Sequence, residues 1–132
     1  MGTRSIIAAV FDPAVVNEAG VVSTYCHYDG YPEWTGRLLK NLYNDDNSAF
    51  EIASIGYLSG LQDTMEGNLD KTKHQHKDEP VFYNSLQELF DEMDTAGSWV
   101  EYVYYWQDDE WYCVKRADGS VTPLGCMTFT EN

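Results

Sequence analysis

The sequence VEYVYYWQDDEWYCVKR, at positions 100–116, contains the clearest strand pair of the chain. Residues 100–106 alternate with a period of two, so that two sets of side chains point to opposite faces of a strand. The alternation resumes over residues 111–116, after the Asp108-Asp109 turn. Two alternating runs joined by a short turn predict an antiparallel hairpin. The hairpin therefore indicates that the fold contains a β-sheet.

Three further segments predict strands. Residues 5–11 form a near-continuous apolar run, which is typical of a buried strand. Residues 21–28 predict a second strand, and the turn before it favours pairing of the two as a hairpin. A last strand is expected within residues 121–129, at an edge of the sheet because Pro123 lacks the N–H that a central strand donates.

The helices are predicted between these strands. Apolar residues at helical spacing indicate helices at 33–43 and through residues 50–55, and a capping box opens a third at 85–94. The polar residues 62–80 predict an exposed loop. The order of elements predicts one α+β domain over residues 1–132. Its antiparallel sheet has about four to five strands, and its helices pack on one face.

Charge excludes some classes of partner. The formal net charge is −14, and residues 41–132 carry eighteen acids and five bases. Residues 78–114 contain ten carboxylates and no Lys or Arg. Such a surface repels nucleic acid and anionic membranes and attracts basic partners. No apolar run approaches the ~20 residues of a membrane-spanning helix, and no secretory signal is present, so we expect a cytoplasmic protein.

Enzyme and metal motifs are not found in the sequence. The three cysteines are widely spaced and predict reduced residues of the core or the sheet, and His74-Gln75-His76 has lysine neighbours that suit a solvated loop better than a metal site. No arrangement of a nucleophile, a base and an orienting group is recognisable. We therefore expect a non-catalytic protein without a cofactor or a metal.

Two short motifs carry a resemblance to a known family. The chain begins Met-Gly-Thr-Arg-Ser at positions 1–5, and Asp-Gly-Tyr-Pro at 29–32 precedes a predicted helix that contains a glycine. This combination resembles a family of small uncharacterised proteins from phages and bacteria. The match covers residues 1–42 and continues weakly over 52–60. The resemblance implies a phage or prophage origin, hence the cytoplasm of the host cell, and it implies no activity.

The acidic stretch suggests a binding surface. Carboxylates on the predicted helix and at the hairpin tip, beside aromatic residues, are typical of an interface with a charged rim. A solubilising role is the alternative explanation of these acids. With the implied phage origin, they predict a protein that mimics DNA and inhibits a host nucleic-acid-handling or defence protein with a basic surface. The predicted partner-binding residues are Asp91, Glu92, Asp94, Tyr105, Asp108, Asp109, Glu110 and Trp111.

A second hypothesis places a small ligand at the N-terminal hairpin. Arg4 begins one strand and the Asp29 turn ends the next, so antiparallel pairing would bring the two together. Arginine suits a phosphate, and aromatic rings stack on a base, which predicts a pocket that sequesters a nucleotide-like signal. The alternatives are an Arg4–Asp29 ion pair with a purely structural turn, or a nucleotide-processing enzyme. The predicted pocket residues are Arg4, Tyr25, His27, Asp29, Tyr31, Trp34 and Arg37.

Overall fold

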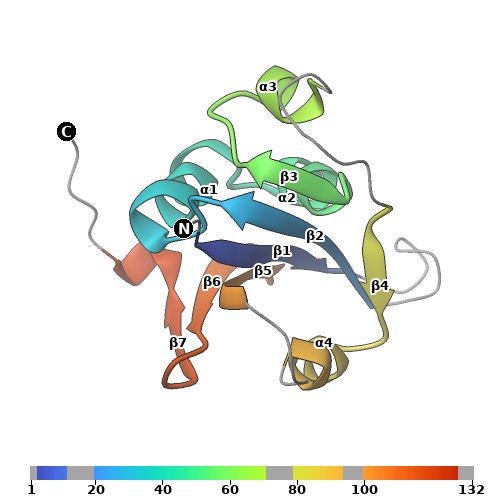
Figure 1. Cartoon of the computed structure of the whole chain (residues 1–132), viewed down its shortest axis with the longest axis vertical. Coiled ribbons are helices and arrows are strands. Elements are labelled where there is room, and N and C mark those ends of the chain that lie inside the picture. The colour runs from blue at the N-terminus through green and yellow to red at the C-terminus, as the bar shows by residue number, and fades with distance from the viewer. Residues whose placement is uncertain (1–2, 12–19, 71–78, 94–99, 128–132) are drawn as a thin grey trace.

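The computed structural model describes residues 3–11, 20–70, 79–93 and 100–127, which form an α+β fold around one seven-stranded sheet (Figure 1). In chain order the strands are β1 (Arg4–Val10), β2 (Val21–Tyr28), β3 (Tyr57–Gly60), β4 (Val81–Tyr83), β5 (Val100–Gln107), β6 (Glu110–Lys115) and β7 (Ser120–Pro123). The two predicted hairpins, β1–β2 and β5–β6, are both confirmed as antiparallel pairs.

The sheet is mixed, with strand order β3-β2-β1-β5-β6-β7. The central strand β1 pairs in parallel with β5, and β2 pairs in parallel with β3 and antiparallel with β4. The prediction of a purely antiparallel sheet of four to five strands is therefore wrong. Both parallel pairs join segments that are distant in the sequence, and local patterns carry no information about such pairing. The last strand ends at Pro123, where a 3₁₀ turn follows, and residues 128 and 129 of the predicted strand lie outside the described residues.

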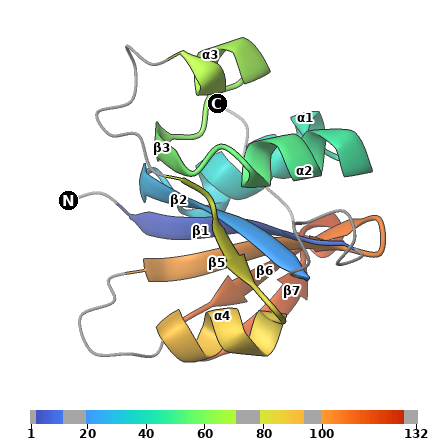
Figure 2. The same ribbon diagram turned by 90° about the vertical axis from the view of Figure 1, so that its right-hand side faces the viewer.

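Helices cover both faces of the sheet (Figure 2). In chain order they are the π-helix η1 (Pro32–Gly36), α1 (Arg37–Leu42), α2 (Asp46–Ala53), α3 (Met65–Leu69), α4 (Leu86–Met93) and the 3₁₀ turn η2 (Leu124–Cys126). The helices α1 and α2 pack on one face, and α4 packs on the other. The prediction that all helices lie on one face is wrong.

The reason for two covered faces lies in the central strands. On β1, Ile7 faces the α1/α2 side and Ile6 faces α4, and both are buried. On β5, Trp106 faces the α1/α2 side and Val103 faces α4. An apolar side chain on each face of a strand needs a cover on each face, because leaving one such side chain in water costs about 1.5–3 kcal/mol. The near-continuous apolar run at residues 5–11 is the sequence signal of a strand covered on both faces, because such strands do not alternate.

The segment predicted as an exposed loop at 62–80 is partly packed. Thr64 caps α3 by accepting a hydrogen bond from Gly67 N at 3.0 Å. The buried Asn68 accepts from Gln62 N and donates to the Tyr43 hydroxyl, both at 2.7 Å. Residues 62–70 are therefore tied to α1, while 71–78 lie outside the described residues.

Two further properties follow from the described part of the chain. None of its helices combines the length and the apolar character that crossing a bilayer requires. Its cysteines are free: Cys26 and Cys113 are buried in the sheet, as predicted, whereas Cys126 is exposed in η2.

Candidate functional site

The two motifs of the family resemblance contact each other. The Gly30 N–H donates to the carbonyl of Thr3 at 2.8 Å. A Cβ added to Gly30 would lie 2.6 Å from Oγ of Ser5 and 2.8 Å from the Thr3 oxygen, closer than real Cβ atoms approach. Only glycine therefore fits where the Asp-Gly-Tyr-Pro turn crosses the start of β1. The pairing of these two motifs in one sequence has a packing explanation.

The same turn is fixed to the core by two hydrogen bonds. The buried Thr35 hydroxyl donates to the Asp29 carbonyl at 2.6 Å, and the buried Tyr104 hydroxyl donates to the Gly30 carbonyl at 2.7 Å. Burial raises the pKa of Tyr104 well above its ordinary value, so this hydroxyl stays a donor. Asp29 adopts a left-handed backbone with φ of 59°. These contacts give the turn a structural role.

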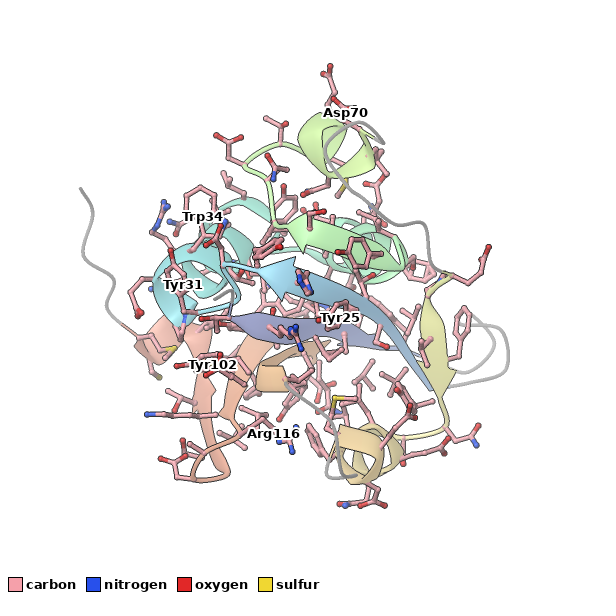
Figure 3. The ribbon with its side chains drawn as sticks, viewed as in Figure 1. Tyr25, Tyr31, Trp34, Asp70, Tyr102 and Arg116 are labelled. Atoms are coloured by element: carbon pink, nitrogen blue, oxygen red, sulfur yellow. The ribbon has the colours of Figure 1, made fainter. Side chains whose placement is uncertain are left out.

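The predicted ligand pocket is divided between two places (Figure 3). Trp34 and Arg37 belong to η1 and α1, where the Trp34 indole donates to the Leu61 carbonyl at 2.8 Å and the Arg37 guanidinium lies 5.6 Å from the ring centre. Tyr31 is exposed at the start of η1, whereas Tyr25 lies in the sheet. Pairing of the first two strands could not predict this division, because the chain crosses to the α1/α2 face of the sheet after Gly30.

Arg4, Tyr25 and His27 do lie together, on the α4 side of β1 and β2. The Tyr25 hydroxyl and Nδ1 of His27 are 2.9 Å apart, and the tautomer of His27 decides which of them donates. Burial raises the pKa of Tyr25, and the positive charge of Arg4 opposes that rise. Among the described residues Arg4 forms no ion pair with Asp29, so the alternative explanation by such a pair is wrong.

Two aromatic residues that the sequence analysis missed extend this group. The ring centres of Tyr25 and Tyr57 are 5.8 Å apart, and His27 meets Tyr28 edge to face at 4.4 Å. Tyr57 lies on β3, and local sequence patterns do not predict the parallel pairing of β3 with β2. The arrangement sets the charge of Arg4 within reach of Tyr25, with the Tyr57 ring beside Tyr25 on the same sheet face, which suits a planar anionic group.

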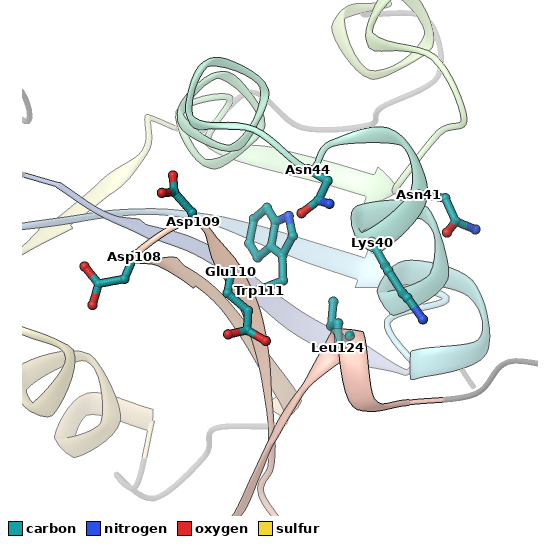
Figure 4. A pocket seen from close by; sticks show the side chains of 9 residues that line it. Lys40, Asn41, Asn44, Asp108, Asp109, Glu110, Trp111 and Leu124 are labelled. Atoms are coloured by element: carbon teal, nitrogen blue, oxygen red, sulfur yellow. The ribbon is translucent and has the colours of Figure 1, made fainter.

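The acidic hairpin tip borders a hollow of about 360 Å³ on the α1 side of the molecule (Figure 4). Its carboxylates stand on one side, the α1 side chains stand on the other, and Trp111 lies between them. We call it the acidic hollow. It is lined by Lys40, Asn41, Asn44, Asp108, Asp109, Glu110, Trp111, Leu124 and Gly125.

Trp111 is part of the floor of the acidic hollow and is not an exposed anchor. Only 1% of its surface is exposed, and its indole N–H donates to the Tyr43 carbonyl at 2.9 Å. Trp111 was predicted as a partner-binding residue, but its burial leaves it only a place in the floor of the hollow. Alternation identified the strand correctly, but it could not show that the face bearing Trp111 is covered by α1.

The lining of the acidic hollow includes more negatively charged side-chain acceptors than cations. Asp108, Asp109 and Glu110 supply three carboxylates, and the two asparagines supply amide oxygens. The ammonium group of Lys40 also lines the hollow, where it donates to the Met127 carbonyl at 3.1 Å and keeps its positive charge. The three carboxylates outnumber this one cation, so the hollow can receive a donor-rich cation.

The backbone at the hairpin tip is strained. Asp108 and Asp109 have φ angles of 53° and 65°, which is the left-handed region at both central positions of a two-residue turn. Turns of this kind favour Asn-Gly, because glycine carries no penalty there. Two adjacent carboxylates at these positions add charge repulsion to the backbone strain.

More carboxylates lie at the start of α2, close to this tip. Asp45 caps the helix by accepting from Ser48 N at 2.7 Å. Asp46 accepts from the Trp106 indole at 2.7 Å, and Trp106 is paired with Trp111 across the hairpin. The sequence analysis did not assign these two acids to the binding surface. The contact of Asp46 with the hairpin extends the acidic surface beyond Asp108 and Asp109.

Of the remaining predicted partner-binding residues, Asp91, Glu92 and Tyr105 lie on the other face of the sheet. Asp91 and Glu92 are exposed on α4, and Asp94 lies outside the described residues. Tyr105 is half-buried, stacked on Tyr112 with ring centres 5.0 Å apart. The acids that we predicted as one surface therefore form two surfaces, separated by the sheet.

Comparison of the chain with protein-family models, with curated proteins and with solved structures found no match. Among the described residues no group of three or more His, Cys, Asp or Glu is arranged to hold a metal ion.

Proposed function

We propose that this chain is a phage-type acidic protein that binds and inhibits a host nucleic-acid-handling or defence protein with a basic surface. The observation that carries the proposal is the acidic hollow, a space of about 360 Å³ that has three carboxylates and two amides among its lining residues. An arginine side chain is the protein group that this lining fits best. Its guanidinium donates to several acceptors at once, and its methylene stem packs on the apolar floor.

The overall charge supports the same kind of partner. A net charge of −14 on 132 residues creates a negative potential around the molecule. Such a potential speeds the approach of a basic protein and repels nucleic acid. The α4 carboxylates lie across the sheet from the acidic hollow, so we assign them to this long-range attraction rather than to contact.

The test compares two triple variants with equal net charge. Asp108→Asn, Asp109→Asn and Glu110→Gln together remove the carboxylates of the hollow, and asparagine tolerates the left-handed backbone of the turn. The matched control removes three exposed acids away from the hollow, through Asp63→Asn, Glu66→Gln and Glu79→Gln.

The tagged wild type and both variants are incubated with extracts of bacteria that carry defence systems, and captured proteins are identified at low and high salt. We expect a basic protein that the wild type and the control retain at low salt and that the hollow variant loses. Equal retention by both variants would reject the hollow as the contact.

A second candidate function is the sequestration of a small nucleotide, with Arg4, Tyr25, His27 and Tyr57 as its contacts. The convergence of a guanidinium and aromatic rings on one sheet face favours it. Arg4→Lys keeps the charge and loses the two-pronged geometry. If this function holds, the substitution weakens binding of a nucleoside monophosphate at least tenfold, about 1.4 kcal/mol, in calorimetry. Unchanged binding would remove this candidate.

A further inference from the structure

A second cavity, of about 270 Å³, lies at the opposite end of the sheet from the hairpin tip. Its floor is the α1/α2 face of the last three strands. Cross-strand pairing sets Tyr102, Lys115 and Ser120 in one row and places Thr122 beside Cys113 in the next. Pro32 and Glu33 of η1 form one wall, and Met127 forms another. We call this cavity the sheet pocket. None of its residues was among the predicted ligand-binding or partner-binding residues.

Two opposite charges border the sheet pocket without neutralising each other. Glu33 and Lys115 both line it, and in the described part of the chain neither has an ion-pair partner. Both charges act on the Cys113 thiol, where Glu33 raises the pKa and Lys115 lowers it. The two groups therefore lie within electrostatic reach of one thiol, yet remain available to a ligand.

The other lining groups are neutral. Burial is the main cause that raises the pKa of Cys113 to about 11, so the thiol stays protonated at neutral pH and is no nucleophile. The hydroxyls of Tyr102 and Thr122 have no hydrogen-bond partner among the described residues. Pro32, Met127 and the Tyr102 ring supply apolar surface. The lining thus offers one cation, one anion, free hydroxyls and an apolar wall.

The size of the sheet pocket limits the ligand. Pockets for drug-sized molecules occupy roughly 300–1,000 Å³, and this one lies just below that range. A protein side chain from a partner would satisfy one of the two charges and leave the other unpaired. A molecule that carries both charges a few bonds apart satisfies the two together.

We propose that the sheet pocket binds a compact zwitterion of the size of a free amino acid, with its carboxylate at Lys115 and Thr122 and its ammonium group at Glu33. This site is separate from the acidic hollow and does not rest on the proposed function. It would make the chain a sensor or carrier of a small metabolite in addition to a partner-binding protein.

The test is calorimetric titration of the whole chain with the twenty common amino acids, one at a time. We expect at least one to bind with a dissociation constant below about 1 mM. The N-acetyl and carboxamide derivatives of the same amino acid each lack one charge, and we expect each to bind at least tenfold more weakly. Absence of binding by all twenty at 10 mM would overturn the proposal.

Variants locate the binding. Glu33→Gln and Lys115→Met should each weaken the best ligand at least tenfold while leaving the melting temperature within about 2 °C, because both side chains are exposed. The matched control is Glu101→Gln, an exposed acid of β5 beside Tyr102 on the other face, which should leave binding unchanged. Binding that survives both pocket substitutions would lie elsewhere and would contradict the proposal. The hollow variant Asp108→Asn/Asp109→Asn/Glu110→Gln should bind the amino acid normally, which separates this test from that of the proposed function.

Discussion

Single residues of the Asp-Gly-Tyr-Pro turn connect the family resemblance to the fold. Gly30 fits against Ser5 and Thr3, and its carbonyl accepts the buried Tyr104 hydroxyl. A motif that looks like a ligand loop in the sequence is thus explained by packing. Turn residues of this kind recur for structural reasons, and only the contacts in the fold separate the two interpretations.

Tyr104→Phe tests this account of the turn. The substitution removes the hydroxyl and leaves the Gly30 carbonyl buried without its donor, which costs about 1–3 kcal/mol. Tyr102→Phe is the matched control two residues along the same strand, because the hydroxyl of this partly buried residue has no hydrogen-bond partner among the described residues. Urea unfolding of both variants gives the comparison. A Tyr104→Phe protein as stable as the control would show that the turn is not held in this way.

At the scale of elements, the β5–β6 hairpin combines fold and proposed function. Its turn places Asp108 and Asp109 in the left-handed region, where Asn-Gly is the favoured sequence. Strain of this kind is often found at functional sites. Glycine would relieve the left-handed backbone of this turn, and the proposed contact with a basic partner would explain why two aspartates stand there instead.

Replacing Asp108-Asp109 by Asn-Gly should therefore stabilise the protein and weaken its binding to the partner. We expect a gain of about 0.5–1 kcal/mol in the free energy of unfolding, from relief of backbone strain and of charge repulsion. Binding of the captured host protein should fall at the same time. Thermal unfolding and a binding assay on the same preparation check both halves. A variant that is less stable than the wild type would contradict the proposal that this turn is strained. A variant that binds the host protein as tightly as the wild type would contradict the proposed role of the carboxylates.

The elements also show how far sequence patterns reach in this protein. Both hairpins were predictable because their strands are neighbours in the chain. The parallel pairs β1–β5 and β2–β3 were not, since they join distant segments, and β4 has only three residues. The acidic tip was predictable from composition. The burial of Trp111 and the partners of Tyr25 depend on which helix or strand covers which face.

At the scale of the whole molecule, buried thiols and phenols set the response to alkali. Burial is the main cause that raises the pKa of Cys26 to about 11 and that of Tyr83 to about 12, from ordinary values of 9.0 and 10.0. A raised pKa in the folded state means that the folded protein holds its proton more tightly than the unfolded chain. This contribution to stability is complete below pH 9 and is lost as the pH rises towards 12.

The urea midpoint should therefore stay level up to pH 9 and decline steadily between pH 9 and pH 12. Cys26→Ala removes one of these groups and should flatten the part of the decline between pH 9 and pH 11. The measurement is urea unfolding, followed by tryptophan fluorescence, at steps of half a pH unit. A midpoint that is constant to pH 11.5 would show that these groups titrate alike in the folded and unfolded states.

The central claim is the proposal that this protein recognises a basic partner through the β5–β6 tip. The net charge of −14 and the acidic hollow support it. The most direct test is the association rate constant of the captured host protein between 50 and 500 mM salt, for the wild type and for the two charge-matched triple variants. Charge-steered association slows as salt shortens the range of the field. We predict at least a tenfold fall for the wild type and for the Asp63/Glu66/Glu79 control. For Asp108→Asn/Asp109→Asn/Glu110→Gln we predict an affinity at least tenfold lower at every salt concentration. A rate that is independent of salt, together with full affinity in the hollow variant, would contradict the claim.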